Sequence, residues 1–138
     1  MVTRLRTSKI AKERLDNLNS VLRMSSNAVI LRYAIAKSIE CNKNISEDQD
    51  AEVLDNSGFE ITRQTLFGEN EILYKTLFGI GSKEKDELFF PALTNMHIER
   101  GLKILEREYR YAGNKEKFLK NIINNLEYAM MYNFFDEK

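Results

Sequence analysis

Two arginines flank a leucine close to the start of the chain, in the alternating run Val2-Thr3-Arg4-Leu5-Arg6-Thr7. Alternate side chains of a β-strand share a face, so Leu5 can face the protein while Arg4 and Arg6 project from the other side. In the major groove of DNA, an arginine donates a pair of hydrogen bonds to guanine. This spacing predicts a basic strand that contacts nucleic acid.

More cations follow on the polar face of an expected helix, and Arg23 lies at its end. Ser25 or Ser26 is a good N-cap for a second helix, whose free backbone amides and dipole attract phosphate. A nucleic-acid contact is therefore expected in this first segment of the chain. The predicted DNA-binding residues are Arg4, Arg6, Lys9, Lys12, Arg14, Arg23, Ser25 and Ser26.

The elements that position these residues follow the order strand, helix, turn and helix. Apolar residues at helical spacing predict one helix from about Ser8 to Leu22 and a second from Asn27 to Ile39. This order is typical of a ribbon-helix-helix unit. A short strand is unstable alone, so it implies pairing with a second copy, and the second helix offers an apolar face suited to a dimer core. That face comprises Val29, Ile30, Tyr33, Ala34 and Ile39.

An alternative reading of this segment stays open. The glycine often found in the turn of such units is absent, with Arg23 near its expected place. Alternation over six residues is also a weak strand signal. Residues 2–7 can instead form a frayed terminus before an ordinary helical hairpin.

Charge is segregated along the chain, although its 138 residues have a formal net charge of zero. Residues 1–40 carry eight Lys or Arg and three Asp or Glu, whereas residues 41–95 carry five and eleven. Residues 96–138 are nearly balanced, with eight and seven. A DNA contact therefore belongs to the first segment, and the acidic middle region can contact a basic partner protein.

The length and composition predict one mainly α-helical domain over residues 1–138. We expect a compact helical domain with an N-terminal ribbon-helix-helix-like unit and a C-terminal helical hairpin. Its parts are a basic DNA-binding unit over 1–41, an acidic middle region over 42–95 and the hairpin over 96–138. Within the middle region, we expect extended structure or a short loop over residues 58–69, followed by a helix over Asn70–Phe78.

The C-terminal region shows the clearest helical patterns. An apolar stripe that includes Ile98, Leu102 and Leu105 predicts one helix, and Gly113-Asn114 ends it. The last helix is expected from about Lys115 to Phe135. Its predicted inward side chains are Phe118, Leu119, Ile122, Ile123, Leu126, Met130 and Phe134.

Residue types that support catalysis or bind metals are few. His97 is the only histidine, so no histidine pair can bind metal, and it is expected to cap or pack a helix start. Cys41 is the only cysteine, which excludes an internal disulfide and fits a reducing cytoplasm. Glu69 and Glu71 resemble part of a two-metal nuclease site, but adjacent glutamates are common on helix surfaces. We therefore predict no catalytic, metal or cofactor residue, and no apolar run approaches the ~20 residues that a membrane helix needs.

Three blocks of the sequence together resemble one protein family. A basic N-terminal helical unit is followed by Phe59-Glu60-Ile61-Thr62-Arg63-Gln64-Thr65-Leu66-Phe67-Gly68-Glu69 and then by His97-Ile98-Glu99-Arg100-Gly101-Leu102. In this order they resemble the DNA sulfur modification protein DndE family, over nearly the whole chain. The resemblance implies a small subunit of the DNA phosphorothioation machinery of a restriction-modification system, in which sulfur replaces a non-bridging phosphate oxygen. It also implies homo-oligomers that bind duplex DNA, preferably nicked, beside a cysteine desulfurase, an iron–sulfur protein and an ATPase.

We therefore expect a cytoplasmic DNA-binding subunit, a dimer or tetramer, with no cofactor, no membrane contact and no catalysis of its own. Phosphate contacts would give it weak sequence preference and a steep dependence on salt. One alternative is a ribbon-helix-helix repressor or antitoxin that reads bases through Arg4 and Arg6. Another is a scaffold that binds partner proteins through its acidic middle region. A DNA-nicking enzyme is a third, without any sequence signature.

Overall fold

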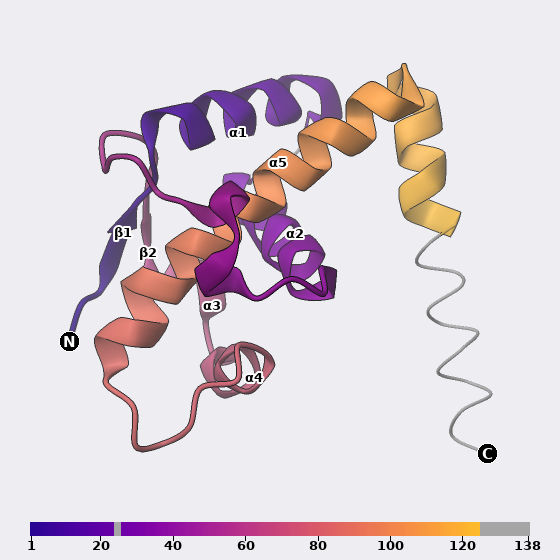
Figure 1. Cartoon of the computed structure of the whole chain (residues 1–138). Helices are drawn as coiled ribbons and strands as arrows, with labels where there is room; N and C mark the ends of the chain where they lie inside the picture. Colours follow the sequence, from indigo (N-terminus) through magenta and orange to yellow (C-terminus); the bar gives the residue numbers. More distant parts are fainter. Residues whose placement is uncertain (24–25, 125–138) are drawn as a thin grey trace, which may run out of the picture. The chain divides into compact units, whose positions relative to one another are not determined.

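The computed structural model describes residues 1–23 and 26–124. The chain folds into two compact units, Met1–Glu106 and Arg107–Lys138, and each is described by itself. The described residues are mainly helical, as predicted, with one small sheet among them (Figure 1). The predicted divisions at residues 41 and 95 both lie inside the first unit. No helix in the described part of the chain is long and apolar enough to cross a membrane.

The first unit begins with a two-stranded antiparallel ribbon. Strand β1 (Arg4–Arg6) pairs with β2 (Glu60–Thr62), and Leu5 lies opposite Ile61. Both of these apolar side chains are buried. The predicted strand is confirmed and residues 4–6 are not frayed, but the prediction that β1 pairs with a second copy is wrong. The partner strand lies in the same chain, more than fifty residues away in the sequence.

Two helices follow β1, so the order strand, helix, turn and helix is confirmed. Helix α1 (Lys9–Leu22) begins at the Ser8 cap, whose Oγ accepts a hydrogen bond from the Ala11 N–H. Helix α2 (Asn27–Glu40) begins at Ser26, which caps the Ala28 N–H in the same way. These bonds satisfy backbone donors that a helix start leaves unpaired. Arg23 ends α1 in the left-handed conformation, at φ 51°, where such a turn often has glycine.

The apolar face of α2 packs within its own chain. Ile30 and Ala34 are buried there together with Leu31 and Ile35, so the centre of this face is not available for the predicted dimer core. Val29 is 38% exposed, and Tyr33 and Ile39 are half-buried. The physical reason is the length of the chain: the residues after α2 supply the packing partners that a shorter ribbon-helix-helix protein takes from a second copy.

The acidic middle region begins with two short 3-10 turns, η1 (Ile45–Glu47) and η2 (Gln49–Ala51). After β2, helix α3 (Arg63–Phe67) occupies part of the stretch predicted as extended or loop. Thr62 is the reason, because its hydroxyl accepts a hydrogen bond from the Thr65 N–H and caps a new helix. Helix α4 (Glu71–Leu77) then follows close to the predicted bounds.

The segment η3 (Leu88–Leu93) contains a cis peptide bond between Phe90 and Pro91 and leads into α5 (Thr94–Ala112). Helix α5 runs beside both α1 and α2 (Figure 1), with Ile98, Leu102 and Leu105 buried as predicted. At Gly101 a Cβ atom would lie 1.8 Å from the Ala34 carbonyl oxygen, so α5 and α2 cross with their backbones in contact. Only glycine fits at this crossing.

In the second unit, Gly113 ends α5 at φ 84°, and residues 115–124 are helical. The Tyr109 and Phe118 rings meet edge to face, with their centroids 5.4 Å apart. Phe118 is buried as predicted, but Ile123 is 53% exposed instead of inward. The described part of the predicted last helix is therefore confirmed. The predicted inward positions Leu126, Met130 and Phe134 lie outside the described residues.

Candidate nucleic-acid interface

The outer face of the ribbon presents the two arginines that the alternation predicted. The Arg4 and Arg6 side chains are 67% and 49% exposed, while Leu5 between them is buried. Glu60 of β2 lies directly across from Arg6. Its two carboxylate oxygens lie 3.7 Å from Arg4 Nη1 and 3.6 Å from Arg6 Nη2. Two guanidinium groups therefore share one carboxylate, and the cluster keeps a net positive charge.

Backbone hydrogen bonds hold this ribbon in place at both ends. The Thr7 N–H donates to the Phe59 carbonyl and the Arg63 N–H donates to the Thr3 carbonyl, both at 2.8 Å. On the other edge of β1, Asn95 Nδ2 donates to the Arg6 carbonyl at 3.0 Å. The arginine backbones are thus fixed by partners in β2 and α5, so the ribbon is a rigid base for flexible side chains.

Two of the three predicted cations on α1 are exposed. Lys12 forms an i,i+4 ion pair with Asp16, with 2.9 Å between Nζ and the carboxylate. Lys9 is exposed, and its backbone N–H donates to Asp55 Oδ1 at 2.8 Å. Hydrogen bonds from the Lys9 and Ser57 backbones hold the pKa of the Asp55 carboxyl below its usual value. Both lysines therefore stand beside acidic side chains that partly offset their charge.

Arg14 differs from the expectation, because it does not lie on the solvent face of α1. Its side chain is only 17% exposed and lies 3.4 Å from Glu106 and 3.9 Å from Glu99 of α5. Glu99 is itself buried and accepts a hydrogen bond of 2.6 Å from Ser8 Oγ. The reason is helical spacing, since Arg14 is four residues before the buried Leu18 and shares its side of the helix. Arg14 therefore joins α1 to α5.

The turn between α1 and α2 contains the remaining predicted residues. Arg23 is exposed, and its N–H donates to the Asn19 carbonyl at 2.7 Å to close α1. The Ser26 side chain is engaged as the cap of α2. Ser25 lies outside the described residues. Arg23 is therefore an exposed cation at the end of α1, while the Ser26 hydroxyl already caps α2.

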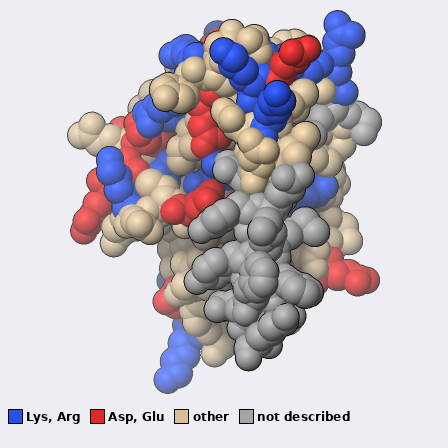
Figure 2. Space-filling model, turned by 90° about the vertical axis from the view of Figure 1, so that its right-hand side faces the viewer, with Lys and Arg blue, Asp and Glu red and all other residues tan. Residues whose placement is uncertain are grey.

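One face of the molecule shows how the charges are distributed. In Figure 2, Lys and Arg side chains alternate with Asp and Glu side chains and do not merge into one large basic patch. Opposite charges also pair locally at Glu60 and at Asp16. At these two places a cation and a carboxylate therefore lie together, and the local charge is partly offset.

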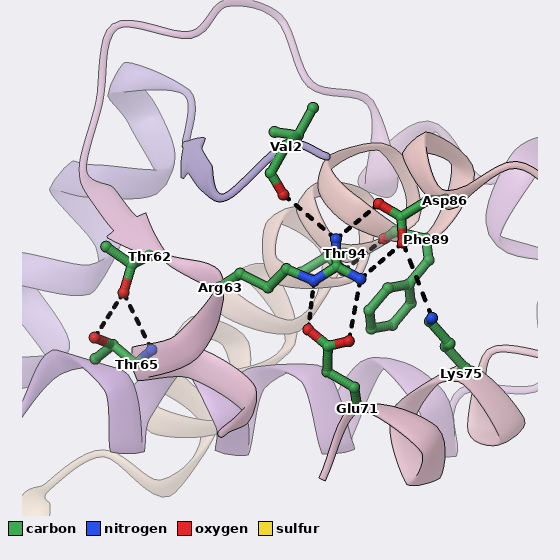
Figure 3. Close-up of polar contacts among 9 residues, drawn as sticks. All are labelled: Val2, Thr62, Arg63, Thr65, Glu71, Lys75, Asp86, Phe89 and Thr94. Atoms are coloured by element: carbon green, nitrogen blue, oxygen red, sulfur yellow. Dashed lines mark hydrogen bonds and ion pairs between the residues drawn. The ribbon is translucent and has the colours of Figure 1, made fainter. Parts of the chain in front are cut away.

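A buried arginine cluster, not predicted from the sequence, is centred on Arg63, which is 4% exposed. Figure 3 shows its guanidinium between the carboxylates of Glu71 and Asp86, with hydrogen bonds to both. The rings of Phe89 and Phe90 lie 5.5 Å from the guanidinium carbon. The hydrogen bonds raise the pKa of Arg63, and those from Arg63 lower the pKa of the Asp86 carboxyl.

This Arg63 cluster is structural. Its single guanidinium ties α3 to α4 and to the loop before η3, and it also donates to the Val2 carbonyl at 3.3 Å. Glu71 is one of the two glutamates considered as nuclease ligands, and both of its carboxylate oxygens accept hydrogen bonds from Arg63. Among residues 1–23 and 26–124, no group of three or more His, Cys, Asp or Glu side chains is arranged to hold a metal ion. The apolar pair Leu66 and Phe67 could have indicated that Arg63 is buried. Residues three and four positions apart share a helix face, so Arg63 lies on the same buried side as this pair.

A second buried polar cluster surrounds His97, which packs as predicted. His97 Nδ1 lies 2.8 Å from Ser38 Oγ, and its ring stacks on Phe78 with 4.3 Å between centroids. Arg100 donates to the same Ser38 Oγ from Nε at 2.8 Å and forms an ion pair with Asp48. Burial, and next the positive charge of Arg100, lower the pKa of His97 to about 4. Ser38 is fully buried, so this serine–histidine pair cannot reach a substrate.

Comparisons with known proteins give the fold and the family. The structure resembles the crystal structure of DndE from Escherichia coli B7A, involved in DNA phosphorothioation modification, with 20% identity and a TM-score of 0.54 over 76% of this chain and 97% of that one. It also resembles the DndE G21/24K mutant, with 19% identity and a TM-score of 0.54 over 78% and 99% of the two chains. No curated protein sequence matches the chain. The family model of DNA sulphur modification protein DndE matches residues 4–113, and the chain therefore belongs to the DndE family.

Proposed function

We propose that the protein is a cytoplasmic, homo-oligomeric, DNA-binding subunit of the DNA phosphorothioation machinery, without catalysis of its own. Family membership supports the place in DNA sulfur modification. The crystal structures that share its fold belong to proteins involved in DNA phosphorothioation, which supports the same reaction system. A subunit of this kind would work with the other proteins of the machinery, to which it presents duplex DNA.

The observation that carries the DNA-binding part is the exposed pair Arg4 and Arg6 on a rigid ribbon. A guanidinium matches the geometry of a phosphate group with two parallel hydrogen bonds, and such charge-assisted bonds are among the stronger ones. The buried Leu5 keeps both arginines on the outer face. Lys9 and Lys12 follow on the next helix and extend the set of exposed cations.

Phosphate contacts suit this surface better than base readout. Strand β1 contains three residues and its partner strand belongs to the same chain, so it presents only two arginines. A repressor of the ribbon-helix-helix class reads bases with a ribbon that two copies share. We therefore expect weak sequence preference, with an affinity that falls steeply as salt rises.

The test is the affinity for a fluorescent duplex of mixed sequence, intact or nicked, measured by anisotropy at several salt concentrations. The variant Arg4→Ala/Arg6→Ala should bind about 10- to 100-fold more weakly at low salt, because each lost phosphate contact removes a counterion-release contribution. The slope of log affinity against log salt should fall by about 2, one for each arginine. The matched control is Lys83→Ala/Lys85→Ala, which removes the same charge from the exposed loop before η3.

Three outcomes separate this proposal from its alternatives. Equal loss of affinity in both double variants would assign the effect to net charge and contradict the ribbon as the contact surface. A sharp palindromic consensus selected from random duplexes would instead favour a repressor. A wild-type protein that retains partner proteins but no DNA at low salt would favour a scaffold that acts through the acidic middle region.

The oligomeric state is a separate part of the proposal. Sedimentation velocity of the full chain should show a dimer or tetramer, since closed symmetric assemblies can bring the ribbons of several copies to one duplex. A monomer at micromolar concentration, with or without DNA, would contradict this part and leave the DNA contact itself unaffected.

A further inference from the structure

Glu60 occupies the place on the ribbon where a phosphate would be expected to bind. Its two oxygens lie within 3.7 Å of the two exposed guanidinium groups. A carboxylate and a phosphate offer similar pairs of anionic oxygens to arginine. The free protein therefore already satisfies Arg4 and Arg6 with an internal anion, an inference that rests on the DNA-binding function proposed above.

The contacts of Glu60 are weak enough to be exchanged. All three side chains are well exposed, at 42% for Glu60 and at least 49% for the arginines. Ion pairs between exposed side chains stabilise a protein little, because water and salt screen them. An incoming phosphate can therefore take both guanidiniums from Glu60 at small cost. The carboxylate would then remain close to the phosphate and repel it.

Glu60 is not needed to hold the ribbon together. Leu5 and Ile61 pair on the buried side, and backbone hydrogen bonds flank the paired residues. Asn95 supports the free edge of β1. A stabilising role confined to one exposed cross-strand ion pair would be minor. The position of Glu60 has a larger consequence for an anionic ligand than for the fold.

We propose that Glu60 is a built-in competitor for the DNA phosphate on the ribbon. It holds the two guanidinium groups side by side on the outer face when DNA is absent, and it limits the affinity of the arginine pair when DNA is present. The surface would thereby favour reversible binding of many duplex sites over tight binding at one. The ligand class is the phosphodiester backbone of duplex DNA.

The experiment compares Glu60→Gln with wild type in the same anisotropy titration. Glutamine keeps the size of the side chain but removes its charge, so duplex affinity at low salt should rise about three- to tenfold. This gain should shrink as salt rises, because screening weakens the repulsion between exposed charges. The matched control is Glu84→Gln, which makes the same charge change on the exposed loop before η3. It should leave the affinity within about twofold of wild type, because the carboxylate that pairs with Arg4 and Arg6 is that of Glu60.

A double-mutant cycle assigns the effect to the arginines. In the background Arg4→Ala/Arg6→Ala, the gain in duplex affinity from Glu60→Gln should largely disappear, because the two guanidinium groups that Glu60 shares with the phosphate are then absent. An unchanged or weaker affinity of Glu60→Gln in the otherwise wild-type chain would overturn the inference, as would an equal gain from Glu84→Gln.

Failure of this inference is distinguishable from failure of the proposed function. If Arg4→Ala/Arg6→Ala loses duplex binding while Glu60→Gln binds like wild type, the arginines contact DNA but Glu60 does not compete. If neither wild type nor Glu60→Gln binds duplex at low salt, the DNA-binding function itself is contradicted. Urea unfolding of Glu60→Gln provides the check on folding, and its midpoint should stay close to that of wild type.

Discussion

The ribbon and the Arg63 cluster use arginine and carboxylate in opposite proportions. On the ribbon, two exposed guanidiniums share the single carboxylate of Glu60. In the interior, the one guanidinium of Arg63 holds the two carboxylates of Glu71 and Asp86, and Lys75 lies 3.9 Å from Asp86. The first arrangement leaves positive charge for an external anion, whereas the second satisfies its cation completely. The proportion of charges and their burial, rather than the residue type, separate a binding arginine from a structural one.

The largest expected effect comes from breaking the interior cluster. Replacing Arg63 with methionine leaves Glu71 partly buried without its cation and Asp86 with only Lys75, which should cost about 3–5 kcal/mol of unfolding free energy. Urea denaturation followed by circular dichroism measures this loss. Arg63→Lys is the control, because lysine keeps the charge but cannot donate paired hydrogen bonds to both carboxylates. Its unfolding free energy should lie between those of wild type and Arg63→Met. A change below about 1 kcal/mol in Arg63→Met would remove the contrast with the ribbon, since that is the range of exposed pairs.

An intermediate effect is expected from pH at the buried His97. The folded state keeps His97 neutral down to about pH 4, whereas an unfolded histidine takes up a proton near pH 6.5. The unfolded state therefore binds more protons between these values, and stability should fall as pH falls from about 6.5 to about 4, by up to about 3 kcal/mol. Urea midpoints at several pH values measure this slope.

The variant His97→Asn serves as the control for that slope. Its amide can replace the contact to Ser38 but takes up no proton, so the decline between pH 6.5 and 4 should be reduced. The Asp48 and Asp86 carboxyls have lowered pKa values, and their contributions fade below this window. For Asp48, burial raises the pKa, but hydrogen bonds from Asp50 and Arg100 outweigh it. A slope that persists unchanged in the variant would place the titrating group elsewhere.

The smallest effect on stability should come from the ribbon itself. Arg4→Ala/Arg6→Ala should shift the unfolding free energy by less than about 1 kcal/mol, because exposed ion pairs contribute little. The same urea experiment measures it. A small loss of unfolding free energy together with a large loss of duplex affinity would show that these arginines bind DNA, whereas Arg63 stabilises the fold. A loss of several kcal/mol would instead mean that these arginines hold the fold.

Local features of the fold were readable from the sequence because they depend on neighbouring residues. Alternation placed Leu5 inside and the arginines outside, Ser8 marked the start of α1, and Gly113 marked the end of α5. Each of these signals acts within a few residues, where propensity and capping decide the conformation.

Features that depend on distant residues were not readable. The three residues of β2 carry no sign of their partner, so the pairing of β1 was assigned to a second copy. Arg14 was predicted on the polar face of its helix and Arg63 was given no structural role, because nothing near them in the sequence indicates their carboxylate partners on other elements. For the candidate site, the sequence therefore indicated the arginines themselves, but the shared Glu60 required the three-dimensional pairing.

The proposed DNA contact is the outer face of the ribbon, with the adjoining start of α1. The most direct test is a map of backbone amide chemical shifts of the full chain during titration with a short duplex. The largest changes are expected at residues 4–12 and at Glu60, with little change at residues 43–50 and 79–87. Changes confined to those two loops, with residues 4–12 unaffected at saturating duplex, would contradict it.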